Sequence, residues 1–188
     1  MNKNKKTVFL FTLFFALLVI PRLSAQCGMV NTAFKSGEKI SYDLYFKYGI
    51  LNARAGKGSL SITEANYKGE RAYKTHMLLN TSGLAGSVYT VNDTLTSFVD
   101  MNVRPLLFTK EAFEGSDYST EKQVYSYNKN TISVRAIRTW NGKPDFDEVV
   151  TTDKCAYDYL SVLLYVRNID FSGMKKGDRK SIPFLSGK

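Results

Sequence analysis

The feature that most constrains the fold of this chain is a regular alternation of apolar and polar side chains in short segments. In residues 40–48 every even-numbered position carries an apolar or aromatic side chain, while the odd-numbered positions include Ser41, Asp43 and Lys47. A period of two is typical of a β-strand with one buried face. The composition, with 12 Tyr, 12 Phe and only 4 Pro, agrees with this pattern because flat side chains fit a pleated sheet. We therefore expect a mainly β protein.

Turn residues recur about every 8–12 residues, and this spacing is typical of a meander or a barrel. The clearest turn is Asn141-Gly142, because both residues favour the positive φ of a two-residue hairpin loop. A glycine-containing turn is expected from Gly49 to Gly58. The fold class that we expect is a curved antiparallel sheet or meander, or a partly open β-barrel. Its further strands are predicted in residues 58–64, 71–79, 89–99, 106–113, 118–127, 131–140 and 146–151.

One segment after these strands has helical spacing. Between residues 156 and 167 the apolar side chains recur at intervals of three and four, with Thr152 or Asp153 available as the N-cap. We expect one α-helix near residues 156–167, with its leucine-rich face on the sheet. Residues 180–185 resemble the start of another strand that the chain end interrupts. The sequence therefore predicts the N-terminal part of a longer protein, truncated at its C-terminus.

The first 25 residues have the pattern of an export signal. Lys3, Lys5 and Lys6 precede an apolar run over residues 8–20, and small residues precede Gln26, so we expect cleavage between Ala25 and Gln26. The run is shorter than the roughly 20 residues that span a bilayer, so we expect no transmembrane span in the mature chain. Residues 26–188 then form a single β-rich domain in the periplasm or cell envelope. The alternative is a lipoprotein anchored through Cys27, which the bulk of Gln26 disfavours.

Removal of the signal changes the charge balance. Residues 1–25 contain four Lys and Arg residues and no acidic ones, so the net charge falls from +9 to +5. The remaining basic residues are interspersed with acidic ones, and nucleic acid is not the expected partner. The densest basic cluster, residues 175–180, is interrupted by Gly and Asp and is expected in a solvated turn. Anionic head groups or surface glycans are the weaker alternative for this cluster.

The chain lacks the motifs of common catalytic, metal and nucleotide sites. His76 is the only histidine and lies in a predicted strand, so a Ser-His-Asp arrangement has no local support. One His and two distant Cys do not make a zinc site. Residues 145–148 lack the spacing of a calcium-binding loop. Gly56-x-Gly58 is followed by strand residues and not by a helix, which argues against a phosphate loop. We expect no catalytic residues, no metal and no cofactor.

The two cysteines are the one pair with a plausible covalent role. Export would place Cys27 and Cys155 in an oxidising compartment, where an even number of cysteines favours pairing. A bridge would close a long loop and stabilise the fold by up to roughly 4–5 kcal/mol. Free thiols remain the alternative.

The order of these segments resembles the exported bacterial domain-of-unknown-function 3108 family. The resemblance covers about residues 33–188. It is carried by the Gly37-Glu38-x-x-x-Tyr42 start and by the segment Tyr157–Arg167, which ends in an aromatic-x-Arg pair, with Gly177-Asp178 downstream. It implies an envelope protein built on a curved antiparallel sheet, without an established activity. A Gln at the mature N-terminus is similar to the exported proteins of Bacteroides-type bacteria.

Two functions from different classes follow. The first is a non-catalytic module that holds a lipid or another hydrophobic ligand, or docks an envelope protein. Its cavity would be lined by Tyr42, Leu44, Phe46, Tyr73 and Met77, each of which is also explained as an ordinary core residue. The alternative is an envelope hydrolase that acts on glycans through carboxylates such as Asp43, Asp93 or Glu111. It requires two carboxyl groups about 5–10 Å apart in one cleft.

Overall fold

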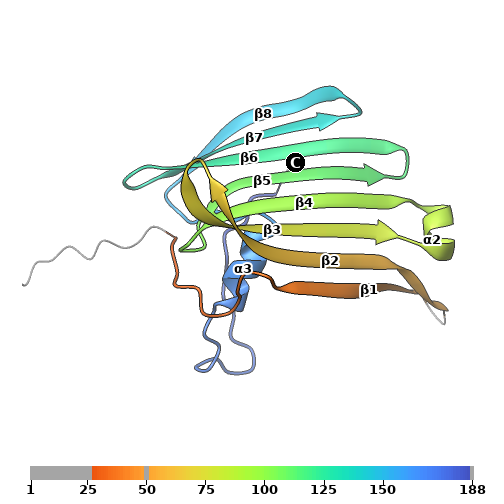
Figure 1. Ribbon diagram of the computed structural model, residues 1–188, viewed down its shortest axis with the longest axis horizontal. Coiled ribbons are helices and arrows are strands. Elements are labelled where there is room, and N and C mark those ends of the chain that lie inside the picture. The colour runs from red at the N-terminus through yellow and green to blue at the C-terminus, as the bar shows by residue number, and fades with distance from the viewer. Residues whose placement is uncertain (1–26, 49–50, 187–188) are drawn as a thin grey trace, which may run out of the picture.

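The computed structural model describes residues 27–48 and 51–186 and has a single antiparallel sheet of eight strands (Figure 1). The strands follow one another in space in the order of the chain. β1 pairs with β2 at one edge and β8 pairs with β7 at the other, so the sheet is an open meander and not a closed barrel. The expected fold class is confirmed. The strands are β1 (Lys39–Tyr48), β2 (Leu51–Tyr67), β3 (Glu70–Thr81), β4 (Val91–Asp100), β5 (Pro105–Glu114), β6 (Asp117–Tyr127), β7 (Ile132–Trp140) and β8 (Lys143–Thr152).

The hairpin predicted at Asn141-Gly142 is confirmed. Trp140 pairs with Lys143, so the loop has two residues, and their φ values are 48° and 76°. The expected signal peptide of residues 1–25 and its cleavage point between Ala25 and Gln26 lie outside the described residues.

Two expectations about the strands are wrong. The turn expected from Gly49 to Gly58 does not extend over that range, because β2 already begins at Leu51. The strand expected in residues 180–185 is reduced to a single bridge between Tyr157 and Phe184. This segment contacts the chain at Tyr157 and does not add a strand to the sheet.

The described residues form two short helices, α2 (Gly83–Val88) and α3 (Ser161–Arg167). The helix expected near residues 156–167 is present, but it begins five residues later. The Asp158 carboxylate accepts hydrogen bonds from the N–H groups of Leu160 and Ser161, both at 2.9 Å, and so defines where the helical turn starts. The expected caps at Thr152 and Asp153 were therefore wrong. α2 was not predicted, since its two glycines favour a loop.

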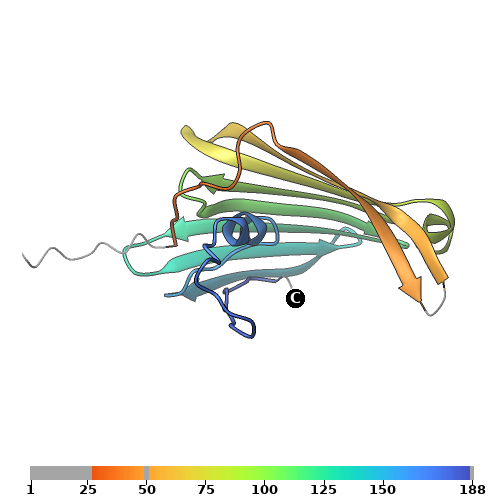
Figure 2. The same ribbon diagram turned by 90° about the horizontal axis from the view of Figure 1, so that it is seen from below.

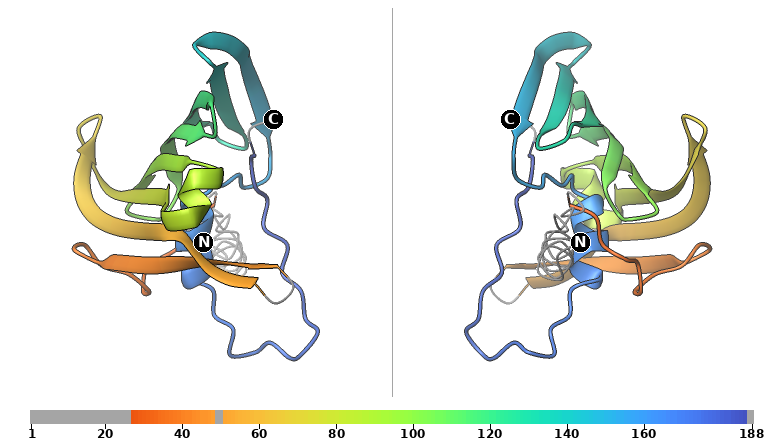
Figure 3. Two further views of the ribbon diagram at one scale, coloured as in Figure 1. Left: turned by 90° about the vertical axis from the view of Figure 1, so that its right-hand side faces the viewer. Right: turned by 90° about the vertical axis from the view of Figure 1, so that its left-hand side faces the viewer.

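α3 lies over one face of the sheet, which we call the inner face (Figures 2 and 3). Part of the core lies between the two, while a further group on β6 and β7 packs with Ala156 and Leu185 instead. Leu164 packs with Ile62, Tyr73 and Val99, and Leu160 packs with a second group that includes Phe108. These side chains come from β2 to β5, so the helix joins strands that are consecutive in the sheet. Burying this apolar surface is the main force that holds α3 in place.

The segments that precede and follow the strands are tied to each other at two places. Cys27 and Cys155 are joined by a disulfide, with their Cα atoms 5.3 Å apart. A sulfur in a disulfide cannot also carry a lipid. Arg167, the last residue of α3, donates hydrogen bonds to both carboxylate oxygens of Glu38, at 2.6 and 3.0 Å. The segment before β1 and the last residue of α3 are thus in direct contact.

Candidate functional site

The inner face has a second end that α3 does not bury. Residues directly opposed in an antiparallel sheet point to the same side, so the register Tyr42–Gly58–Leu79–Asp93 defines one row across this face. We call this row, together with Leu44, Lys110 and Glu114, the open end of the inner face. We call the part beneath Leu160 and Leu164 the covered end. Figures 1 and 2 show α3 near one end of the long strands and α2 at the other.

The part of the open end that belongs to β1–β3 is apolar. Tyr42 is 47% exposed and Leu44 is 37% exposed, although both lie on the face that forms the core elsewhere. Leu79 continues this surface on β3. A patch of apolar side chains on the core-side face of a sheet is not explained by packing within the described residues.

Two glycines on β2 allow this surface to form. A Cβ at Gly56 would lie 2.0 Å from the carbonyl oxygen of Asn80, which no side chain could tolerate. A Cβ at Gly58 would lie 3.1 Å from Cδ2 of Leu79. The Gly56-x-Gly58 pair therefore serves close approach of β2 and β3, in agreement with the sequence argument against a phosphate loop.

The part of the open end that belongs to β4 and β5 is charged. Nζ of Lys110 lies 3.1 Å from Oε1 of Glu114 and 3.5 Å from Oδ2 of Asp93. Burial opposes the charge of Lys110, but the hydrogen bond to Glu114 and the charge of Asp93 outweigh it and raise the pKa of the ammonium group. The three residues form one coupled cluster beside the apolar surface.

Asp93 is the least satisfied member of this cluster. Asp93 is 5% exposed, and its Oδ1 atom has no hydrogen-bond partner among the described residues. Burial is the main cause that raises the pKa of this carboxyl group, against the lowering effect of Lys110. A buried carboxylate oxygen without a donor is costly, and a bound donor group would relieve this cost.

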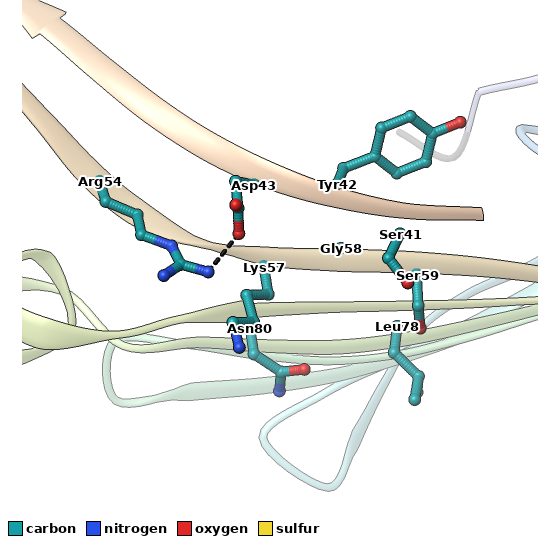
Figure 4. Close-up of a pocket in the computed structure, with 9 residues that line it drawn as sticks. All are labelled: Ser41, Tyr42, Asp43, Arg54, Lys57, Gly58, Ser59, Leu78 and Asn80. Carbon is teal, nitrogen blue, oxygen red and sulfur yellow. Dashed lines mark hydrogen bonds and ion pairs between the residues drawn. The ribbon is translucent and has the colours of Figure 1, made fainter.

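The opposite, outer face of β1–β3 carries a polar groove of 440 Å³ (Figure 4). Asp43 and Arg54 form an ion pair along its wall, while Lys57 and Asn80 present polar ends on the neighbouring strands. Both members of the ion pair are about half exposed, so the pair contributes little to stability. Side chains of this kind can hold a small polar molecule, but none of them is buried.

The five side chains expected to line one cavity are divided between two environments. Tyr42 and Leu44 lie at the open end, whereas Tyr73 stacks edge-on against Phe34 in the core with a centroid distance of 5.1 Å. Met77 packs against the core group that contains Leu60 and Phe108. The side chain of Phe46 lies outside what the structure describes.

The three carboxylates considered for glycan hydrolysis are not brought together. Asp43 lies in the groove of the outer face on β1, and Glu111 lies on the same outer face on β5, with three strands between them. Asp93 lies on the inner face. The carboxylate that shares Lys110 with Asp93 is Glu114. Sequence reasoning missed it, because residues 109–111 and 114 are polar without alternation and do not show which face of the sheet they lie on.

His76 has the ordinary role expected of a strand residue. Its Nδ1 lies 3.0 Å from Oγ1 of Thr96 on the adjacent strand. Burial lowers the pKa of its imidazole, with a smaller contribution from the charge of Lys74. Within residues 27–48 and 51–186, no group of three metal-ligating side chains could hold a metal ion.

Comparison with known protein families matches residues 41–188 to the family described as "Protein of unknown function (DUF3108)". No curated protein matches the chain, and no solved structure matches it. In the described part of the chain, neither helix has the length and apolar character needed to cross a bilayer.

Proposed function

The chain belongs to the DUF3108 family of proteins of unknown function, and we propose that it is an exported, non-catalytic cell-envelope protein that binds a lipid or another hydrophobic ligand. The ligand occupies the open end of the inner face. The observation that carries this proposal is the exposure of Tyr42 and Leu44 on the face that forms the core elsewhere. Contiguous apolar surface of this kind is typical of a ligand or partner site.

The arrangement of the open end favours an amphiphile over a purely apolar molecule. An acyl chain would lie along Tyr42, Leu44 and Leu79, where no charged side chain competes for it. Its polar end would then reach the cluster of Asp93, Lys110 and Glu114 on the next strands. The unpaired Oδ1 of Asp93 would accept a hydrogen bond from a hydroxyl or amine of that polar end.

Export is supported by the signal-like residues 1–25 and is compatible with the disulfide between Cys27 and Cys155. We propose cleavage after Ala25 and an origin in a Bacteroides-type bacterium, because the mature chain would begin with Gln26. An intact mass of protein isolated from its own envelope tests both the cleavage site and the bridge. A mass that includes acyl chains on Cys27 would contradict this part of the proposal.

The ligand proposal is tested by titrating the mature protein with a fluorescent fatty acid. A double variant, Tyr42→Ser with Leu44→Ser, should bind the probe about tenfold more weakly, because it removes most of the exposed apolar surface. Tyr45→Ser is the matched control, since Tyr45 is exposed on the opposite face of the same strand. Equal affinity of the double variant and the control would contradict the site. A wild-type protein that binds no probe and carries no lipid on extraction would contradict the function.

A further inference from the structure

The short helix α2 is an exposed apolar projection at the end of the sheet opposite α3 (Figure 1). Leu84 is 83% exposed and Val88 is 88% exposed, and their spacing of four places them on the same side of the helix. None of the six residues of α2 is buried. These two side chains therefore contribute nothing to the core of this chain.

The chain segment that contains α2 carries no charged residue over a long stretch. From Met77 to Asn92 the sequence contains no Asp, Glu, Lys, Arg or His. Most exposed segments of a soluble protein carry charged side chains, which keep the surface solvated. An uncharged stretch that also projects two aliphatic side chains fits an apolar environment better than water.

The projection is nevertheless firmly held. Oγ1 of Thr81 donates to the carbonyl of Tyr89 at 3.1 Å and accepts the N–H of Val91 at 2.8 Å, which closes the base of the loop. The ring of Tyr89 lies against Gly115 of the neighbouring turn, where an added Cβ would be 2.9 Å from Cε2. The N–H of Gly115 also donates to the carbonyl of Thr90. The apolar side chains are thus presented on a fixed support.

Three exposed aromatic side chains lie near this support, and two of them are tyrosines with a polar hydroxyl. Tyr89 is exposed at the end of α2, and Phe113 and Tyr118 are exposed on either side of the turn at Gly115. Tyrosine is enriched where a protein meets the interface of a bilayer, because its ring is apolar and its hydroxyl remains hydrated. The two exposed aliphatic side chains of α2 therefore have exposed aromatic side chains near them.

We propose that α2 docks on a lipid bilayer, with Leu84 and Val88 inserted into the interface. A stable protein partner would need about 800 Å² of complementary surface on this chain, far more than two side chains on a six-residue helix provide. A bilayer needs no shape complementarity and accepts shallow apolar insertion. The inference does not depend on the proposed ligand, since the residues of α2 are not part of the open end.

The chemistry of α2 also predicts which lipids are required. Because the segment from Met77 to Asn92 has no charge, binding should not need anionic lipids and should not weaken as salt is raised. The basic cluster in residues 175–180 would give the opposite behaviour, since electrostatic attraction to anionic head groups is screened by salt. Salt dependence therefore distinguishes the two surfaces.

The test is flotation of the mature protein with vesicles of phosphatidylethanolamine and phosphatidylcholine, with and without phosphatidylglycerol as an anionic lipid, at low and at high salt. Wild type and Val149→Ser, a control at an exposed apolar residue on β8, should float at both salt concentrations. A double variant, Leu84→Ser with Val88→Ser, should lower the bound fraction about tenfold. Its thermal unfolding should match that of wild type, because neither side chain is buried.

Four results would overturn the proposal. The first is a wild-type protein that does not float. The second is flotation that needs anionic lipid and disappears at high salt. The third is flotation that the double variant retains. The fourth is a wild-type dimer in sedimentation without vesicles that the double variant abolishes, which would assign α2 to an interface between two copies. Fatty-acid binding measured on the same double variant should be unchanged, so failure of this inference is separable from failure of the ligand site.

Discussion

The covered and open ends of the inner face have the same strand pattern but different surroundings. At the covered end, Thr75, Val99 and Phe108 are fully buried beneath α3. At the open end, Tyr42 and Leu44 lie on the same face of the same sheet and remain exposed. Alternation along a strand therefore determines which side chains share a face, but it does not determine whether that face becomes a core. A distant segment of the chain makes that difference.

The covered end also has polar contacts that the open end lacks. Asp158 is fully buried, and its Oδ2 accepts a hydrogen bond from Oγ of Ser97 on β4 at 3.0 Å, while its Oδ1 accepts the N–H groups at the start of α3. At the open end, the buried Asp93 has an oxygen without a partner. One buried carboxylate has hydrogen-bond partners on both oxygens, whereas the other has an oxygen without a partner among the described residues.

The largest expected effect comes from removing the disulfide that ties the covered end together. Cys27 and Cys155 are 128 residues apart, so opening the bridge in a Cys27→Ser, Cys155→Ser variant should lower the free energy of unfolding by about 4 kcal/mol. The reason is that the unfolded chain regains the freedom which the closed loop removes. Urea unfolding measures the loss, and wild type in reductant should behave like the variant. A loss below about 1 kcal/mol would mean that the bridge adds little to the covered end.

A smaller but still large effect is expected when the contact between α3 and the sheet is weakened. Leu164 is fully buried among Ile62, Tyr73 and Val99. Leu164→Ala should therefore cost about 3 kcal/mol in the free energy of unfolding, since it removes buried methyl groups and leaves a cavity. Chemical denaturation is again the measurement. If the variant is as stable as wild type, α3 does not form the core of the covered end.

The ion pair between α3 and the segment before β1 should contribute less. The hydrogen bonds from Arg167 lower the pKa of the Glu38 carboxyl group, although burial opposes this shift. The stabilisation from this ion pair is therefore present above the pKa of a glutamate in the unfolded chain, about 4.3. It is lost as the pH falls through the lower pKa of Glu38 in the folded protein. Glu38→Gln should cost about 1 kcal/mol at neutral pH and less at pH 3.

The control for this prediction is Glu64→Gln. Glu64 pairs with Arg71, but both side chains are largely exposed, so its loss should change the stability by less than about 0.5 kcal/mol at any pH. Denaturation curves at pH 3 and pH 7 for both variants provide the comparison. Equal losses for Glu38→Gln at the two pH values would contradict an ionised pair at the covered end.

The sequence was sufficient for the architecture because its signals are local. The alternation in residues 40–48 and the positive φ preference of Asn141-Gly142 depend only on neighbouring residues, and both predictions are confirmed. The start of α3 was placed five residues too early because its cap, Asp158, is a residue inside the apolar periodic segment. A capping side chain that is itself buried does not look like a helix boundary.

The site was less predictable because it depends on contacts between distant segments. The sequence identified Glu38 and Arg167 only as parts of a resemblance, and the ion pair between them spans 129 positions. Tyr42, Leu44, Tyr73 and Met77 have the same pattern in their strands, and nothing local separates the two exposed residues from the two in the core. Lys110 and Glu114 lie in a segment without regular alternation of polar and apolar residues, so their orientation follows only from the pairing of β4 with β5.

A small effect on stability is expected from a matching Leu→Ala substitution at the open end. Leu44→Ala removes the same atoms as Leu164→Ala, but Leu44 is already 37% exposed, so the free energy of unfolding should fall by less than about 1 kcal/mol. If the open end is a binding surface, its apolar side chains contribute to affinity and not to folding. The fluorescent fatty acid should therefore bind Leu44→Ala more weakly while its denaturation midpoint stays close to that of wild type. A loss of stability as large as that of Leu164→Ala would show that the two ends are one continuous core, and the distinction between them would fail.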